Sequence, residues 1–445
     1  MEQFVEFLRG AVRSGVETRA FRAAREREEA AQEWVAGAES SHSEIGVGRL
    51  GRLLALQSWL SADTCNPGVL PPPQNVRLID RPSATAFVLL LTYRKGAGLA
   101  FKMWFAPVNG ASEAAKFFHL AYSNEARFYT EFLTPLVERG STPHLLTALA
   151  YTECPDLVKA LARLKHLDQN QVSSLAKMVN PKLSAAGRNP RDATLPVGRV
   201  LVTEVAPSAT ELHRAAEGMG TEDLLQIYVQ LFYTLFVLDL SRVRHNDMHF
   251  GNVMVQRLEK PVTLAYVFGG QEVLFLKGVR FFALLYDWDN GSAPGIVPFE
   301  RWVGMDPAQH GGNVWDLVMF TRNLVLEADV LGLLPLGEPS AQKFLDFYVS
   351  TLVPDAFARS RIEDAGLDWA FIQDVNLRFN LEGATVHNQA SARVVDVPWY
   401  RTLLKHGFFA DFRATPEALS DENVFAPTKE LKQQFLTLFR ASMFG

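Results

Sequence analysis

A polar stretch with the sequence RHNDMHFGNVMV, at positions 244–255, constrains the fold of this chain more than any other part of the sequence. It follows the apolar run LLQIYVQLFYTLFVLDL at 224–240, which predicts a long buried helix, and it leads into the strand-like text NVMVQ. The chain is therefore expected to pass from a core helix through a polar loop into a strand. The loop carries two histidines, an aspartate and an asparagine, which are side chains suited to chemistry.

Two chemistries fit the spacing of these side chains. His245 and His249 have the i, i+4 spacing of the zinc-binding H-E-x-x-H helix. Asp247 and Asn252 have the spacing of the aspartate and asparagine in the phosphotransfer loop H-R-D-x-x-x-x-N. The zinc interpretation is the minor one, because Asn246 occupies the position of the general-base glutamate and a Phe-Gly pair soon breaks any helix. The sequence therefore favours phosphotransfer.

Composition narrows the class of protein. The chain has 445 residues, of which 48% are hydrophobic and 21% charged, as expected for a soluble globular protein of about two or three domains. The formal net charge of −5 argues against a protein that coats nucleic acid. The two cysteines, Cys65 and Cys154, form no C-x-x-C pair, so neither a disulfide framework nor a cysteine zinc site is expected. A reducing, intracellular compartment is the simple interpretation.

Two segments of the sequence are candidates for a secretory signal or a membrane span, and neither is expected to serve as one. The N-terminal text MEQFVEFLRG carries Glu2 and Glu6 and lacks the apolar core of a secretory signal. The run at 224–240 is slightly short for a membrane span, contains Gln226 and Gln230 and ends near Asp239, so a core helix is the better interpretation.

The order of predicted elements suggests three parts. Residues 1–70 are expected to form a helical N-terminal extension that ends in a proline-rich break, residues 71–205 a small sheet-containing domain, and residues 206–445 a larger domain dominated by helices. The first domain is expected to contain an insertion at 155–197, rich in basic residues. The predicted strands are 75–80, 84–93, 98–105, 144–152, 199–205 and a strand-rich segment at 253–286, and the predicted helices are 112–138, the run near 224–240 and the region around 399–413.

Phosphotransfer requires further residues at a distance from the loop, and the sequence offers a candidate for each. Lys102 lies mid-strand between apolar neighbours in GLAFKMWF. Glu125 falls on the apolar face of the helix predicted at 112–138, where a carboxylate calls for a cation. Asp287 follows an apolar strand in VRFFALLYDWDNGS. The alternatives are that Lys102 and Glu125 are surface charges and that Asp287 starts a turn with Asn290-Gly291.

With these residues in place, the chain resembles the protein-kinase-like family. The resemblance implies a bilobal α+β fold, with a small antiparallel-sheet N-lobe and a mainly helical C-lobe. It implies that Lys102 holds the nucleotide phosphates and that Glu125 is its helix partner. It also implies that Asp247 is the catalytic aspartate, and that Asn252 and Asp287 are the metal ligands.

The same resemblance extends to the nucleotide and to the support of the loop. The segment LVTEVAPSATELHRA at 201–215 is similar to the hinge between kinase lobes. Thr203 would then be the gatekeeper, the backbone of Glu204 and Ala206 would face the adenine, and Glu211 would reach the ribose. In the segment NVWDLVMF, Asp316 is expected to brace the catalytic loop.

The chain departs from the family pattern in several places. The link between the first two strands, DRPSAT, has no glycine, and Ser83 and Thr85 would have to take over contacts to phosphate. Asn246 replaces the motif arginine, and Asp289 replaces the glycine two residues after Asp287. An H-N-D loop is also found in choline kinases, and the strand pair VTLAYVFGGQEVLFLKG resembles the kinases of large DNA viruses.

The resemblance implies an enzyme that uses ATP and Mg²⁺, or Mn²⁺. A divergent protein Ser/Thr kinase with a protein substrate is favoured, and a small-molecule kinase and a pseudokinase acting as a binding or structural module are the alternatives. Neither nucleic acid nor a membrane is expected as a partner. The protein is expected to be cytoplasmic, and it could be encoded by a virus or associated with a virion. The sequence leaves the substrate and the oligomeric state open.

Overall fold

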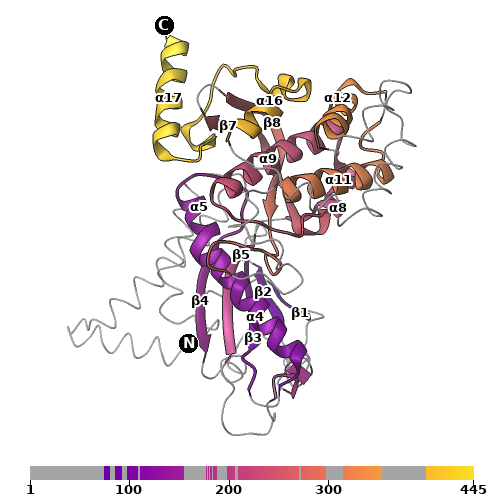
Figure 1. Cartoon of the computed structure of the whole chain (residues 1–445), viewed down its shortest axis with the longest axis vertical. Helices are drawn as coiled ribbons and strands as arrows, with labels where there is room; N and C mark the ends of the chain where they lie inside the picture. The colour runs from indigo at the N-terminus through magenta and orange to yellow at the C-terminus, as the bar shows by residue number, and fades with distance from the viewer. Residues whose placement is uncertain are drawn as a thin grey trace, which may run out of the picture. The chain divides into compact units, whose positions relative to one another are not determined.

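The structure is a computed structural model that describes residues 75–80, 86–92, 98–108, 111–154, 198–205, 209–269, 272–296, 314–335, 337–352 and 397–444, with scattered positions between 177 and 187 (Figure 1). These residues form two compact units. The first contains residues up to 115 together with 149–204, and the second contains 116–148 and 205–444. The division at Glu204 and Val205 lies next to the expected boundary at 205, but residues 116–148, which include most of the predicted helix 112–138, belong to the second unit. The extension predicted at 1–70, Ser83, Thr85 and Ala206 lie outside the described residues.

A five-stranded sheet forms the first unit, with the strand order β1-β2-β3-β5-β4. The strands are β1 (Asn75–Asp80), β2 (Ala86–Thr92), β3 (Gly98–Phe105), β4 (Ala148–Cys154) and β5 (Gly198–Val205). The pairs β1–β2 and β2–β3 are antiparallel, and Lys102 on β3 lies opposite Val88. The expected antiparallel sheet is therefore present, and Lys102 is a buried residue within it.

The helix predicted at 112–138 is interrupted by a π-helical turn. It consists of α4 (Glu113–Arg127), the turn η3 (Phe128–Leu133) and α5 (Thr134–Glu138). The strand predicted at 144–152 begins later, at Ala148, because His144 is bonded to the sheet of the second unit instead. Its Nδ1 lies 2.8 Å from the carbonyl oxygen of Ala283, and its own carbonyl accepts from the Leu285 amide at 2.8 Å.

The core of the second unit is α9 (Thr221–Leu240), in which nearly every residue from Thr221 to Leu238 is buried. This helix is long and apolar enough to cross a membrane by length and composition, but 89% of its apolar window is buried inside the molecule, as in the core helix of a globular protein. Thr221 is the first residue of the helix. Gly220 is the cap, and its amide donates to Asp223 Oδ2 at 3.0 Å.

A second sheet lies beside α9, within a unit whose described residues are otherwise mainly helical. Its strands are β6 (Thr210–Glu211), β7 (Val253–Gly269), β8 (Glu272–Leu285) and β9 (Val424–Phe425). β7 and β8 pair antiparallel with two register shifts between Arg257 and Leu264, and β9 adds to β7 in parallel. The sequence predicted strands at 253–286, but not that two such long strands would form the centre of a four-stranded sheet.

Helices complete the second unit around α9 and this sheet (Figure 1). Their apolar side chains fill the space over α9, where the ring of Phe232 lies 5.4 Å from Tyr400 and 4.9 Å from Phe409. The helical elements are α8 (Leu212–Ala215), η4 (Ala216–Gly218), η5 (Phe250–Asn252), α11 (Val314–Val330), α12 (Pro339–Phe347), η7 (Tyr348–Leu352), α16 (Val397–Leu404), η8 (Gly407–Phe412), η9 (Asp421–Asn423) and α17 (Lys429–Phe444).

One cysteine contradicts the expectation drawn from cysteine spacing. Cys154, the last residue of β4, is disulfide-bonded. The other cysteine of the sequence, Cys65, lies outside the described residues.

Candidate active site

The stretch 244–252 is an irregular loop, which decides between the two chemistries predicted for it. No helix connects His245 to His249, and the first helical turn, η5, starts only at Phe250. His245 Nε2 donates to the carbonyl oxygen of Tyr286 at 2.9 Å, whereas His249 Nδ1 accepts from the Gly251 amide at 3.0 Å. The two histidines therefore do not share a helix face, and the zinc-helix interpretation is wrong. Across the described part of the chain, no group of three or more His, Cys, Asp and Glu side chains could hold a metal ion.

A buried carboxylate on α11 holds the beginning of this loop. Asp316 is 1% exposed and accepts from the His245 amide at 2.6 Å and from the Asn246 amide at 2.8 Å. Burial raises the pKa of Asp316, while His245, Arg244 and the two amide bonds oppose the shift. The brace expected for Asp316 is confirmed, and it holds Asn246 with a positive φ of 63°.

Packing holds the loop from two further sides. Trp288 is fully buried, and its ring centroid lies 4.6 Å from that of His245 and 5.9 Å from that of Phe128. Asn323 on α11 donates to the carbonyl oxygen of Met248 at 2.7 Å. His245 thus supports the loop in two ways, because its ring packs against Trp288 and its Nε2 donates to the Tyr286 carbonyl.

Three of the predicted site residues come together at the end of this loop. Asn252 Nδ2 donates to the carbonyl oxygen of Asp247 at 2.9 Å. The Asn252 carbonyl accepts from the Tyr286 amide at 3.1 Å, so the residue before Asp287 is bonded directly to Asn252. Asp287 itself has a φ of +65°, an uncommon conformation for a residue with a side chain. Asn252 is therefore hydrogen-bonded to Asp247 and to Tyr286, and Asp287 follows Tyr286 directly in the chain.

Sequence reasoning missed the residue that contacts the Asp247 carboxylate. Asn290 Nδ2 lies 3.2 Å from Asp247 Oδ2, and the Asn290 carbonyl accepts from Asn246 Nδ2 at 3.0 Å. The sequence marked Asn290-Gly291 only as a turn, since a turn is the common role of this dipeptide. The pairing of Arg244 with Ser292 through two backbone bonds, at 2.8 and 3.0 Å, brings this turn back to the loop.

The remaining predicted residues are divided between the two units. Lys102, Thr203 and Glu204 lie in the first unit, where Lys102 and Glu204 are buried. Glu125 lies in the second unit and is 4% exposed, so it is not a surface charge. Lys102 is likewise buried, which removes the alternative that either is an exposed residue.

Glu211, predicted to reach a ribose, lies at the start of α8 in the second unit. One of its carboxylate oxygens is 3.5 Å from His213 Nε2 and 3.7 Å from Arg214 Nε. Its side chain is about one-third exposed, so the carboxylate is accessible while it contacts these neighbours. The ribose contact stays a prediction.

The donor set around the loop fits a magnesium ion with bound phosphates. Asn252 uses its amide nitrogen on Asp247, which leaves the amide oxygen for a cation, and Asp287 adds a carboxylate. Mg²⁺ prefers oxygen ligands and is usually held by one or two protein groups together with substrate phosphates. Asp247, whose side chain is 42% exposed, remains accessible to a hydroxyl substrate.

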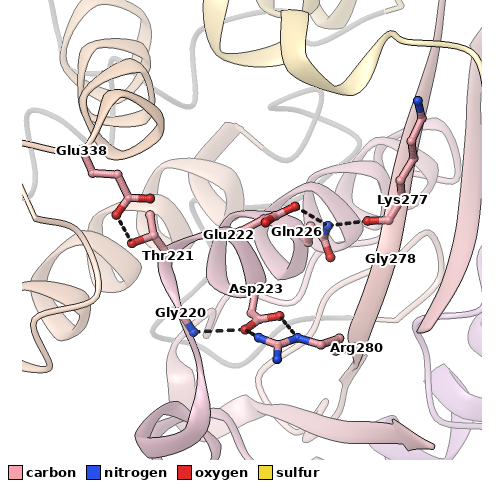
Figure 2. Close-up of a pocket in the computed structure, with 9 residues that line it drawn as sticks. All are labelled: Gly220, Thr221, Glu222, Asp223, Gln226, Lys277, Gly278, Arg280 and Glu338. Atoms are coloured by element: carbon pink, nitrogen blue, oxygen red, sulfur yellow. Dashed lines mark hydrogen bonds and ion pairs between the residues drawn. The ribbon is translucent and has the colours of Figure 1, made fainter. Parts of the chain in front are cut away.

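A polar pocket of about 650 Å³ lies at the start of α9 and contains none of these residues (Figure 2). Several of its polar groups are hydrogen-bonded to other residues of the pocket. Asp223 pairs with Arg280, and Thr221 donates to Glu338 at 2.7 Å. Gln226 Nε2 donates to the Lys277 carbonyl at 2.9 Å. The pocket therefore ties α9 to β8 and to the start of α12, and its polar groups serve the fold.

Comparison with known proteins places kinase domains among the structural matches. No family model and no curated protein matches the chain. Among the solved structures, the Rad53 kinase domain with SCD2 matches at 10% identity and a TM-score of 0.31, covering 82% of this chain and 98% of that one. The kinase domain of PF14_0431 matches at 11% identity and a TM-score of 0.33, covering 76% of this chain and 96% of that one. TM-scores this low do not by themselves establish a shared fold, so a functional assignment has to rest on the geometry of the loop.

Proposed function

We propose that this protein is an ATP- and Mg²⁺-dependent phosphotransferase, with a divergent protein Ser/Thr kinase as the favoured form. One observation carries the proposal. The loop at 244–252 is held so that Asn252 bonds to the backbone of Asp247 on one side and to the chain just before Asp287 on the other. A base and two oxygen ligands brought together in this way are what phosphotransfer to a hydroxyl requires.

In the proposed mechanism, Asp247 accepts or orients the proton of the attacking hydroxyl. Asn252 and Asp287 would hold the metal ion, which supplies neutralising charge to the phosphates when bound. Asp316 and Trp288 act indirectly, because they fix the loop and the segment that carry these residues.

The nucleotide contacts are part of the proposal and come from the sequence. Lys102 would hold the phosphates, with Glu125 as its partner, and Ser83 would assist in place of a glycine-rich loop. Thr203, with the backbone of Glu204 and Ala206, would face the adenine.

A small-molecule kinase is the second candidate, and Asn246 favours it. In protein kinases controlled by loop phosphorylation the motif carries an arginine here, whereas the Asn246 amide donates locally, to the Asn290 carbonyl and to Ser292 Oγ at 3.1 Å. The loop is thus held by neighbouring residues without a phosphorylated segment. A pseudokinase remains the third candidate, because the chain lacks a glycine-rich loop. A cytoplasmic site, a protein substrate and a likeness to viral or choline kinases stay predictions from the sequence.

A thermal-shift titration with Mg²⁺ and ATP tests the proposal. Ligand at about 100 times its dissociation constant should stabilise the protein by about 2.7 kcal/mol. Asp287→Asn should remove the magnesium-dependent part of this gain, whereas Asp289→Asn, which makes the same change in charge two residues away, should keep it. Unchanged melting of the wild type at millimolar Mg²⁺-ATP would rule out the nucleotide assignment.

Phosphate transfer separates the three candidates. Incorporation into a casein-like protein indicates a protein kinase, and transfer only to small alcohols or amino sugars indicates a small-molecule kinase. Nucleotide binding without turnover indicates a pseudokinase. In either active form, Asp247→Asn should keep Mg²⁺-ATP binding while phosphotransfer falls by orders of magnitude.

A further inference from the structure

We propose that Asn290 is a positioning residue for the Asp247 carboxylate. The inference rests on the proposed phosphotransfer function and adds a residue to that site. It starts from the hydrogen bond that Asn290 Nδ2 donates to Asp247 Oδ2 at 3.2 Å.

The carboxylate needs such a restraint, because the terminal torsion of an aspartate is broad when nothing holds it. Asp247 is 42% exposed, so its own packing does not fix the plane of its oxygens. A hydrogen bond to Oδ2 limits rotation about this torsion. On the other side, Oδ1 faces His249 Nε2 at 3.8 Å, and that nitrogen carries the proton because Nδ1 accepts from Gly251.

Asn290 can act as a restraint because its own turn is held firmly. The Gly291 amide donates to the Trp288 carbonyl at 3.1 Å, and the Trp288 ring is fully buried. Beyond the turn, Ser292 exchanges two backbone bonds with Arg244, and the Asn290 carbonyl accepts from Asn246. The turn is therefore bonded to the catalytic loop on both sides of the Asn290 side chain.

The same turn begins at Trp288, directly after the proposed metal ligand, Asp287. The base and the metal-binding segment are thus linked by a side chain as well as by the backbone bond between Asn252 and Tyr286. A shift of the segment after Asp287 would pull Asn290 away from Asp247 and release the carboxylate. Asn290 therefore makes the orientation of the base depend on the position of the metal-binding segment.

Two substitutions separate this role from a role in the turn alone. Asn290→Ala removes the donor and weakens the turn. Asn290→Asp is isosteric and keeps a good turn residue, but it places a carboxylate oxygen where the amide donated to Asp247. Both variants keep the backbone carbonyl that accepts from Asn246. A turn residue would tolerate aspartate, whereas a positioning residue would not.

The test measures kcat and the KM for ATP, with the phosphate acceptor established for the wild type, and Mg²⁺-ATP thermal shifts of the same proteins. A hydrogen bond to a charged group corresponds to about a 10- to 100-fold change in rate. We expect kcat to fall by about this factor in both variants, while the KM for ATP and the thermal shift change little. Wild-type kcat in Asn290→Asp, or a raised KM with kcat unchanged, would overturn the inference. A wild-type protein that binds Mg²⁺-ATP but transfers no phosphate would overturn both the inference and the proposed function.

Discussion

Removal of the buried carboxylate under the loop should destabilise the second unit by a measurable amount. Asp316→Ala leaves the amides of His245 and Asn246 without the acceptor that now lies at 2.6 and 2.8 Å. Each buried amide left unsatisfied costs about 1–3 kcal/mol, so the two together cost about 2–6 kcal/mol. Loss of a buried charge offsets part of this cost, and we expect a net decrease of about 2–4 kcal/mol in the free energy of unfolding.

Urea unfolding, together with hydrogen exchange at the two amides, measures this effect. Exchange at His245 and Asn246 should accelerate more than exchange within α9, because the loop loses its anchor while the helix keeps its packing. Asp346→Ala is the matched control, since that carboxylate is 48% exposed and pairs only with His406 at 3.1 Å. A loss below about 0.5 kcal/mol for Asp316→Ala, with unchanged exchange at the two amides, would refute the assigned role.

The pH dependence of stability gives a second test of the same group. Burial raises the pKa of Asp316 above its usual value of 3.8, so the folded protein binds this proton more tightly than the unfolded chain does. The contribution to the free energy of unfolding is therefore fully present below about pH 4 and is lost as the pH rises through the raised folded-state pKa. Asp316→Asn cannot titrate, so the wild type should lose stability relative to this variant over that range. If the difference in free energy of unfolding between the wild type and Asp316→Asn stays constant with pH, the pKa of Asp316 is not raised.

Three further substitutions test other parts of the structure. Lys102→Met and Glu125→Ala should each reduce phosphotransfer, and their combined effect should be clearly non-additive in kcat/KM; independent losses would mean that the two residues are not a pair. Asp223→Ala removes both the carboxylate that accepts from the Gly220 amide at the start of α9 and the ion-pair partner of Arg280. It should lower the free energy of unfolding by about 1–3 kcal/mol in urea, and an unchanged midpoint would show that the pocket of Figure 2 is not structural. Gly291→Ala places a methyl group 3.0 Å from the ring of Phe128 and should lower the free energy of unfolding by about 1–3 kcal/mol, measured by calorimetry. An unchanged melting temperature would mean that the ring moves aside freely.

Local patterns in the sequence were sufficient for most elements. The strands predicted at 75–80 and 98–105 match β1 and β3, and the run at 224–240 lies within α9. These segments combine a clear apolar pattern with turn signals at their ends, so the local preference and the fold agree. The boundary at 144 was wrong because His144 bonds to a strand more than a hundred residues away, which no local pattern reports.

The site was predictable where residue types and spacing are specific. Asp247, Asn252 and Asp287 were predicted from spacing and from an apolar strand before the aspartate. The structure bonds Asn252 to Asp247 and to the residue before Asp287, and the roles of the three residues stay predictions. Asn290 was missed because an asparagine before a glycine is ordinarily a turn, and its contact with Asp247 depends on how that turn returns to the loop.

The complete burial of α9 has a consequence for how the protein is made. Synthesis runs from the N-terminus, so α9 leaves the ribosome long before Tyr400 and Phe409, whose rings lie against Phe232, and before β9, which pairs with β7. Until the chain as far as Phe425 has emerged, α9, which is apolar enough to cross a membrane, lacks some of the residues that bury it in the folded protein. The loop at 244–252 follows this helix, so it reaches its final support late in translation, and the exposed nascent helix is a natural binding site for molecular chaperones.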